Sequence, residues 1–433
     1  MVTLALWWVH ILRPGALKDV YFVYQSVLVY ASDIALAATL LVWGLERWLR
    51  AQPLAWGPRG LLYAGLGLIA ACLLSAINPL DPGLSLATAA HLALLAGLCC
   101  MCLNDPPRPA QMGWTFGALM LAQAGLAAVQ AATQSTLWPA ILHLRWPGAV
   151  TAAQSGAAVV GASEGVRFLR AYGTFPHPNL LGGMLVVCLG IGVERTLAGG
   201  RKAWLGALAV GTAALFLTFS RAAWAGAATM GLALLLLLPL ALRARALRAL
   251  AVMALSFALL AVAFRPIVLA RVGAARAPVT LESRSTRERL QLLAYAWQAI
   301  RERPLSGLGA GAFAQWIYCL PGKPVTFEPV HNVPLLLAAE MGLPGAVAAL
   351  ALGGAILWRI GRRRQAMGRV EAVWAGIVLG MLVIALADHY DWTMAPMRVM
   401  FVMGVGLYVG MGLTSLCRRR PDPQGISGAR TDC

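Results

Sequence analysis

Long unbroken runs of apolar residues, each followed by a short polar or basic connection, dominate the pattern along the chain. A membrane-spanning helix needs about 20 apolar residues, and these runs lack the alternation that marks the strands of an outer-membrane barrel. The pattern therefore predicts transmembrane helices, at roughly 20–45, 60–77, 84–103, 111–133, 179–194, 203–219, 222–242, 248–264, 333–358, 373–388 and 396–416. The apolar stretch 2–12 is short, and it predicts either a partial twelfth span or an interfacial lead-in.

Composition supports the same class of protein. Of the 433 residues, 60% are hydrophobic and 12% are charged, and the mean hydropathy is +0.72. A soluble domain carries about a quarter charged residues, so these values exclude a soluble enzyme, a disordered chain and a disulfide scaffold. The eight cysteines lie mostly in apolar runs. We expect an all-α, polytopic membrane protein with 11 or 12 transmembrane helices, forming a single integral membrane domain over 1–433.

Basic residues indicate which side of the membrane each connection faces. They recur on alternate connections and on the tail, at Arg47, Arg50 and Arg59, then Arg108, then Arg195, Arg201 and Lys202, then Arg243, Arg245 and Arg248, then Arg359, Arg362, Arg363, Arg364 and Arg369, and finally Arg418, Arg419 and Arg420. The positive-inside rule assigns this side to the cytoplasm. The agreement of these six segments supports the span count from residue 46 onward.

The opposite side carries two long connections, a first segment at about 134–178 and a long loop at about 265–332. Together they hold an excess of seven positive charges, out of a net charge of +18 for the chain. The positive-inside rule applies to short loops, so it neither forbids nor explains this excess of positive charge in two long connections. A GC-rich coding bias would account for the many arginines, since 32 of the 35 basic residues are Arg. Arginine also suits bidentate binding of phosphate, and our working hypothesis is an anionic, phosphate-bearing ligand on this face.

The first candidate constellation leads into the span at 179. Within the segment 167–179, two prolines and a glycine indicate an ordered turn, and several side chains offer hydrogen-bond donors at the membrane surface. These candidate ligand-binding residues are Arg167, Arg170, Tyr172, His177 and Asn179. Asn179 is also a plausible helix N-cap.

Two further constellations supply arginines. Arg221 follows Ser220 at a tight junction between two spans, where a charged side chain is costly. We therefore favour a functional role for Arg221 over an interaction of its side chain with lipid phosphate. Residues 286–303 have helical periodicity, with Leu290, Leu293, Ala294, Trp297 and Ile300 on one stripe. This pattern predicts an amphipathic helix at the outer surface, and its N-terminal arginines, Arg284, Arg287 and Arg289, predict an anion site.

The last two constellations bring in acid–base groups. His331 and Asn332 stand where the long loop re-enters the membrane, and an imidazole there can remove a hydroxyl proton near neutral pH. Glu340, two turns further on, would orient His331 or pair with another helix. At the end of the tenth span, Asp388 and Asp391 would hold an arginine, cap the turn or bind a cation, in that order of preference.

Taken together, these motifs resemble the O-antigen ligase/polymerase superfamily. The resemblance runs over about 167–394 and rests on the order of the motifs: Gly173-Thr-Phe-x-His177-Pro-Asn179, Ser220-Arg221, Arg289 before Pro304-Leu-x-Gly307-Leu-Gly309, His331-Asn332 with Glu340-x-Gly342-x-x-Gly345, and Asp388 with Asp391-Trp-Thr. It implies a GT-C-like glycosyltransferase of the bacterial inner membrane, with its site facing the periplasm and an undecaprenyl pyrophosphate-linked glycan as donor. Ligases pass the glycan to lipid A-core, polymerases to another lipid-linked glycan, and related oligosaccharyltransferases to protein.

The resemblance also implies roles for three residues. Arg221 and Arg289 would hold the pyrophosphate, and His331 would act as general base in an inverting, metal-independent transfer with no cofactor. The expected partners are the lipid-linked donor, a lipid A-core acceptor and membrane lipids, with no nucleic acid. The single long loop before His331 favours a ligase, with a polymerase as the alternative. A lipid-linked glycan transporter is disfavoured, because we find no internal repeat at matching positions in the two halves.

Overall fold

The computed structural model describes residue 4 and residues 7–15, 23–137, 149–154, 156–161, 167–200, 202–272, 280–322 and 326–417. Side chains of 280–282 and 414–417 also lie outside the described part. Several basic residues named above lie outside it too, namely Arg201 and the tail residues Arg418, Arg419 and Arg420. So do most of the residues between 138 and 148 in the first long connection.

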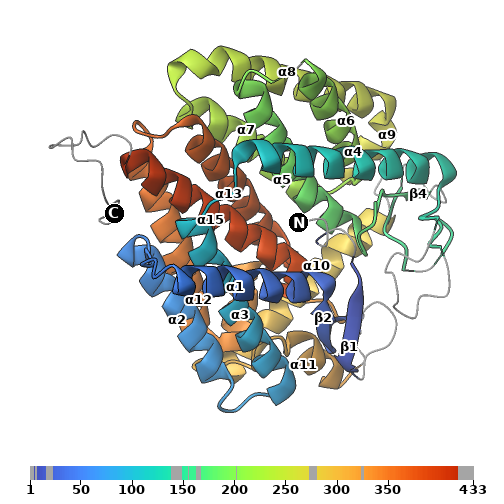
Figure 1. Cartoon of the computed structure of the whole chain (residues 1–433). Coiled ribbons are helices and arrows are strands. Elements are labelled where there is room, and N and C mark those ends of the chain that lie inside the picture. Colours follow the sequence, from blue (N-terminus) through green and yellow to red (C-terminus); the bar gives the residue numbers. More distant parts are fainter. Residues whose placement is uncertain are drawn as a thin grey trace.

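Helices dominate the fold, and each of the eleven predicted spans coincides with one of them (Figure 1). They are α1 (Ala31–Leu49), α2 (Arg59–Ser75), α3 (Pro82–Asn104), α4 (Pro109–Thr133), α5 (Pro178–Leu197), α6 (Ala203–Leu217), α7 (Arg221–Leu237), α8 (Leu240–Ala263), α12 (Val333–Arg363), α13 (Arg369–Ala387) and α15 (Ala395–Cys417). Among the described residues, seven of these helices, α3, α4, α5, α8, α12, α13 and α15, are long and apolar enough to cross a membrane. The chain is therefore an all-α polytopic membrane protein.

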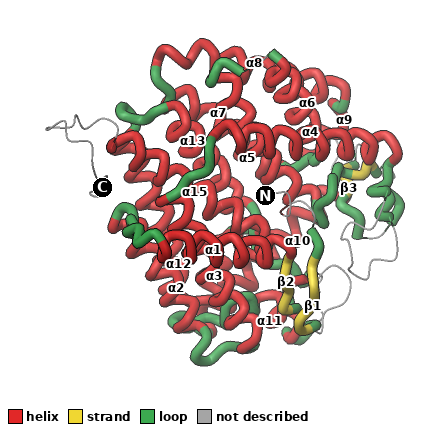
Figure 2. Tube along the Cα trace, viewed as in Figure 1, coloured by secondary structure: helices red, strands yellow, loops and turns green. Residues whose placement is uncertain are grey.

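The remaining elements are short and lie between the long helices. They are α9 (Arg265–Arg271), α10 (Thr280–Glu302), α11 (Phe313–Cys319) and α14 (Tyr390–Thr393), with the strands β1 (Val9–Arg13), β2 (Val27–Tyr30), β3 (Val159–Val160) and β4 (Phe168–Leu169). Each pair of strands forms a small antiparallel ribbon (Figure 2). The amphipathic helix predicted over 286–303 is confirmed as α10.

Of the two alternatives for 2–12, the partial span is wrong for the described residues 9–12, and the interfacial lead-in stays a prediction. Residues 9–12 belong to β1, which pairs with β2 in the register Val9 to Tyr30. Alternating β-branched residues in both segments suit a pleated ribbon better than a helix. For the same reason the first helix begins at Ala31, where the ribbon ends, rather than near residue 20.

α5 is the central helix of the bundle. Within its most apolar stretch 89% of the residues are buried inside the protein, against 17% for the peripheral α8. α13 packs on α5, α7 and α15, while α2 packs on α12 and α3 packs on α15. The core is thus built from the helices around α5 and α13, and the connections are left at the two ends of the bundle.

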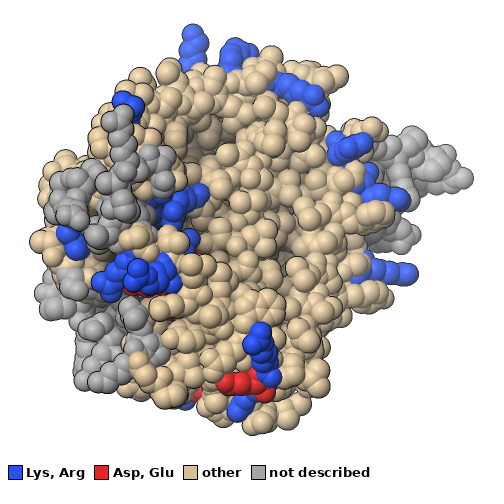
Figure 3. Space-filling view, turned by 180° about the vertical axis from the view of Figure 1, so that it is seen from behind, with Lys and Arg blue, Asp and Glu red and all other residues tan. Residues whose placement is uncertain are grey.

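We call these ends the basic end and the loop end. The basic end gathers the arginine-bearing connections, where Arg369 bonds Glu194 and Arg245 bonds the Leu197 carbonyl. The loop end gathers the described parts of the connections 134–177 and 264–332, the turn 388–394 and the β1–β2 ribbon. Figure 3 shows the charged side chains toward the margins of one face, around a broad area of uncharged residues, as expected of a surface in contact with lipid.

Candidate active site

A cavity of about 420 Å³ opens at the loop end between segments that are far apart in sequence. Its walls come from the β1–β2 ribbon, the stretch before α5, α9, the first turns of α10, the segment before α12 and the turn between α13 and α14. Nine of the residues predicted for the site line this cavity: Arg167, Arg170, Tyr172, His177, Asn179, Arg284, Arg289, His331 and Asp388. The fold therefore joins four of the predicted constellations at one place.

A chain of hydrogen bonds crosses the floor of the cavity. The buried Arg170 donates to the Thr218 carbonyl at 2.7 Å and to the Asn179 side-chain oxygen. Asn179 in turn donates through Nδ2 to Asp388 Oδ2 at 2.6 Å. The predicted N-cap role of Asn179 is wrong, because His177 caps α5 by accepting the Asn179 backbone N–H at 3.2 Å. The Asn179 side chain is thereby available to hold Asp388.

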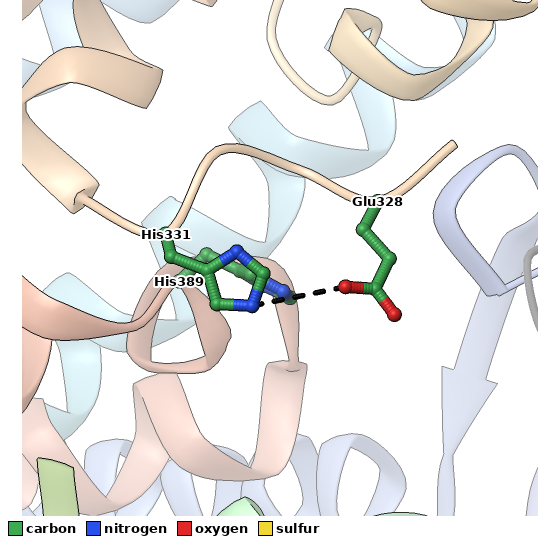
Figure 4. A group of neighbouring side chains, drawn as sticks. All are labelled: Glu328, His331 and His389. Atoms are coloured by element: carbon green, nitrogen blue, oxygen red, sulfur yellow. Dashed lines mark ion pairs between the residues drawn. The ribbon is translucent and has the colours of Figure 1, made fainter. Parts of the chain in front are cut away.

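Three acid–base side chains meet beside this chain, as Figure 4 shows. His331 Nε2 lies 3.7 Å from Glu328 Oε2, and the imidazole rings of His331 and His389 are 5.0 Å apart, edge to face. His389 Nδ1 shares a hydrogen bond of 2.9 Å with Thr393 Oγ1, and this fixes its ring. His331 Nδ1 is buried and has no hydrogen-bond partner among the described residues.

Burial and nearby charge shift the pKa values of these groups. Burial lowers the pKa of His331 to about 3, an effect that Asp388 opposes and that His389 and Arg289 reinforce. Burial raises the pKa of Asp388, but His331, His389 and Arg289 lower it by more, so that it falls below its usual range. At neutral pH the site therefore holds a neutral imidazole, which is able to accept a proton, next to an ionised carboxylate, which offsets part of the effect of burial on the imidazolium.

Glu328, His331 and His389 are also donor types that a divalent metal accepts. Their ligand atoms all lie within 4.8 Å of one another. This spacing is compatible with a shared metal ion as well as with acid–base chemistry.

α10 presents different faces to the cavity and to the outside. Arg289 lines the cavity beside Glu288 and Arg284, which pair at 2.9 Å, whereas Arg287 is exposed and does not line it. The predicted apolar stripe is only partly buried: Leu290 and Trp297 are exposed, and the buried face consists of Leu292, Ala296, Ala299 and Ile300. Hydrophobicity alone could not tell the face toward the protein from a face toward lipid.

Arg221 lies behind the cavity wall. It is the first residue of α7, after the N-cap Ser220, and its guanidinium donates to the Arg271 carbonyl at 3.2 Å. The residue that lines the cavity here is Arg271, which is buried on α9 and donates to the Phe219 carbonyl at 3.1 Å. The arginine expected from the Ser-Arg motif thus contacts the backbone of a second arginine, which reaches the cavity.

The other predicted residues have mainly local bonds. Arg167 and Tyr172 line the cavity while bonding the backbone of the 149–161 stretch. Asn332 does not line it; it caps α12 and bonds the Leu386 carbonyl at 3.0 Å. Asp391 also lies off the cavity, and its buried carboxyl oxygens have no hydrogen-bond partner among the described residues. Burial raises the pKa of Asp391 well above its usual value, with Asp388 adding to the effect.

The motifs did not predict three residues that line the cavity, namely Arg271, Glu328 and His389. Their positions held a signal that was too weak to separate them from neighbours. Arg271 is one of nine basic residues in the long loop, Glu328 precedes His331 by three positions, and His389 follows Asp388 directly. Only the packing of α9 and α14 distinguishes them.

Comparison with known proteins agrees with the resemblance in the motifs. Residues 206–350 match a family model described as O-Antigen ligase. This segment, about a third of the chain, runs from α6 into α12 and includes Arg221, Arg271, Arg289, Glu328 and His331. No curated protein is significantly similar to the chain. Residues 206–350 are therefore similar to the O-antigen ligase family, in agreement with the resemblance that the motifs indicate.

Proposed function

We propose that this protein is an O-antigen ligase of the bacterial inner membrane. It transfers a glycan from undecaprenyl pyrophosphate to a sugar hydroxyl of lipid A-core at the periplasmic face. The observation that carries the proposal is the cavity at the loop end, where arginines, a neutral imidazole and an ionised carboxylate share one wall. The match of residues 206–350 to the O-antigen ligase family supports lipid-linked glycans as the class of substrate.

The arginines would bind the pyrophosphate of the donor. Arg289 faces the cavity, and among the described residues no carboxylate lies within ion-pair distance of its guanidinium. Arg271 and Arg284 line the same cavity and add positive charge around it. Donors preorganised toward a leaving group stabilise the charge that develops on it in the transition state. Arg221, which contacts the Arg271 backbone, would hold α9 in place for this task.

His331 would act as the general base. The neutral imidazole takes the proton of the acceptor hydroxyl as its oxygen attacks the anomeric carbon, and the bond from that carbon to the pyrophosphate breaks. Attack on the face opposite the leaving group inverts the anomeric centre. Asp388, held by Asn179, and Glu328, on the Nε2 side of the ring, would stabilise the imidazolium that forms.

The test is transfer in vitro with the purified protein, a purified lipid-linked glycan and lipid A-core. We expect transfer, with no loss when EDTA is present, because arginine supplies the charge that a metal would otherwise supply. Absence of transfer from an intact donor would contradict the proposed activity. Full loss of transfer with the chelator would contradict the metal-independent mechanism alone.

The lipopolysaccharide of a strain that lacks the protein distinguishes a ligase from a polymerase. Loss of the protein as ligase should remove O-antigen from lipid A-core while long lipid-linked polymer accumulates. Lipopolysaccharide that carries only a single repeat would instead indicate a polymerase. Complementation with the native chain, and with His331→Asn as an inactive control, links the phenotype to this site.

A further inference from the structure

Glu340 lies outside the cavity that holds the proposed site, yet it joins the segments that build it. It is 2% exposed and sits on α12, nine residues after His331. α12 is interrupted just beyond it at Gly342, whose φ of 69° and ψ of −175° are not helical. The loop segment 304–313, which connects α10 to α11, lies across this interruption.

The two segments are bonded through their backbones. Leu308 N–H donates to the Ala339 carbonyl at 3.0 Å, Gly309 N–H donates to the Glu340 carbonyl at 2.9 Å, and Leu343 N–H donates to the Pro304 carbonyl at 2.8 Å. The interruption at Gly342 thus exposes backbone groups that the loop then satisfies.

Two glycines make this close approach possible. A Cβ on Gly307 would lie 2.4 Å from the Glu340 carbonyl oxygen, and a Cβ on Gly342 would lie 2.4 Å from the Leu305 carbonyl oxygen. Both glycines also have positive φ, which other residues rarely adopt. Gly307, in the motif after Pro304, and Gly342, in the motif after Glu340, therefore belong to the same contact between the loop and α12.

The carboxylate of Glu340 adds a third segment to this contact. Its Oε1 accepts the backbone N–H of Phe313, the first residue of α11, at 3.4 Å, and its Oε2 accepts the indole N–H of Trp392 on α14 at 3.1 Å. The guanidinium of Arg398 lies 5.6 Å from the centre of the Trp392 ring. The Trp392 side chain is thus held both at its N–H and over its ring.

We propose that Glu340 is a positioning residue that sets the separation of His331 and His389. The backbone N–H of Trp392 donates to the His389 carbonyl at 2.9 Å, so Trp392 and His389 belong to one rigid turn. Glu340 therefore ties α12, which begins two residues after His331, to the turn that carries Asp388 and His389. The contact leaves His331 itself untouched and acts through α12 and α14. This inference rests on the proposed function for its effect on catalysis, and on packing alone for its effect on geometry.

The geometric test does not depend on transfer. The variant His331→Cys/His389→Cys is treated with a short bifunctional thiol reagent, and the linked peptides are measured by mass spectrometry, with and without Glu340→Gln. A glutamine presents an NH₂ group to one of two N–H donors, so we expect the yield of the cross-link to fall. Unchanged yield in protein that is monodisperse on size exclusion would overturn the proposal.

Glu302→Gln is the matched control. Glu302 also accepts an indole N–H, from Trp316 at 3.2 Å, but this pair joins α10 to α11 and does not connect the two histidine segments. The cross-link should form as in the parent. A similar loss in both variants would mean that any Glu–Trp contact at the loop end has this effect, and the specific role of Glu340 would be rejected.

The kinetic test uses Glu340→Gln and Trp392→Phe, alone and combined. A small misplacement of the base costs rate on the order of tenfold to a hundredfold, so we expect kcat to fall while KM changes little. The two changes break the same bond, and the double variant should be no slower than the slower single one. Independent, multiplying effects would overturn the proposal. Trp392→Phe keeps an aromatic ring but removes the indole N–H, and it provides the same test if Glu340→Gln does not fold.

The experiments distinguish a failure of the proposed function from a failure of the positioning role of Glu340. If the native protein transfers no glycan while Glu340→Gln still lowers cross-linking, the proposed function is wrong and the positioning role stands. If the native protein is active and both variants match it in kcat and in cross-linking, only the positioning role is wrong.

Discussion

The two ends of the bundle use arginine in different ways. At the basic end arginines pair with carboxylates: Arg363 bonds the buried Glu371 through two hydrogen bonds of 2.5 and 3.0 Å, and Arg369 bonds Glu194. At the loop end Arg289 lines the cavity and pairs with no carboxylate among the described residues, although its neighbour Arg284 pairs with Glu288. Carboxylates neutralise the arginines of these pairs at the basic end, so the pairs serve the fold, whereas Arg289 retains its positive charge for an anionic ligand.

Removing the base should give the largest effect on transfer. His331→Asn keeps a polar side chain of similar size but cannot take the proton at neutral pH. Positioned general bases contribute on the order of a hundredfold to ten-thousandfold, so we expect kcat to fall by about that factor. Initial rates of transfer from the lipid-linked donor measure it. His10→Gln, a change at an exposed histidine on β1, should transfer like the parent. Full activity of His331→Asn would refute the assignment.

Arg289 and Arg287 provide the sharpest contrast within the loop end. Both are on α10, but only Arg289 lines the cavity. Arg289→Gln should slow transfer by roughly a hundredfold, the cost of losing one preorganised donor to a developing negative charge. Arg287→Gln should change it little. The comparison is made on kcat/KM with the same donor preparation, and equal losses in the two variants would remove the distinction.

At the basic end the same kind of change should affect stability and leave catalysis intact. The Glu371 side chain is 1% exposed, and Glu371→Gln leaves the Arg363 charge without its partner. Breaking a buried pair in this way costs about 3–5 kcal/mol of folding free energy. We expect a lower Tm in detergent, with unchanged kcat per folded molecule. A normal Tm combined with lost activity would contradict the division between the two ends.

The long helices could be predicted from the sequence more completely than the short elements at the loop end. Membrane spans depend on hydrophobicity summed over about 20 residues, and for this reason each predicted span overlaps a helix, although among the described residues only seven of these helices are long and apolar enough to cross a membrane. Elements shorter than this follow tertiary contacts, so the strand at 9–13 and the capping of α5 by His177 were not. The motifs identified nine of the residues that line the cavity, because the segments around Asn179, His331 and Asp388 lie at the loop ends of spans and the α10 arginines lie in the long loop. They could not choose between Arg221 and Arg271, since that choice depends on how α9 packs on the α6–α7 turn.

The smallest expected effect concerns the pH dependence of transfer. Burial raises the pKa of Glu328 to about 7, with Asp388 and Glu288 raising it further and Arg289 lowering it. The pKa values of His331 and His389, about 3 and about 4, keep both imidazoles neutral from pH 5 to pH 8, and Asp388 stays ionised there. Glu328 is therefore the group of this set that changes charge near pH 7.

As the pH falls through 7, Glu328 gains a proton and loses the negative charge that stabilises the imidazolium of His331. Transfer should consequently slow a few-fold between pH 8 and pH 6. Glu328→Gln removes this titration, and its rate should stay flat over the same range, near the low-pH rate of the parent. Rates measured in buffers of constant ionic strength separate this from screening of the arginines. A step near pH 7 that persists in Glu328→Gln would assign it to another group, and the loop end would then not depend on this carboxylate.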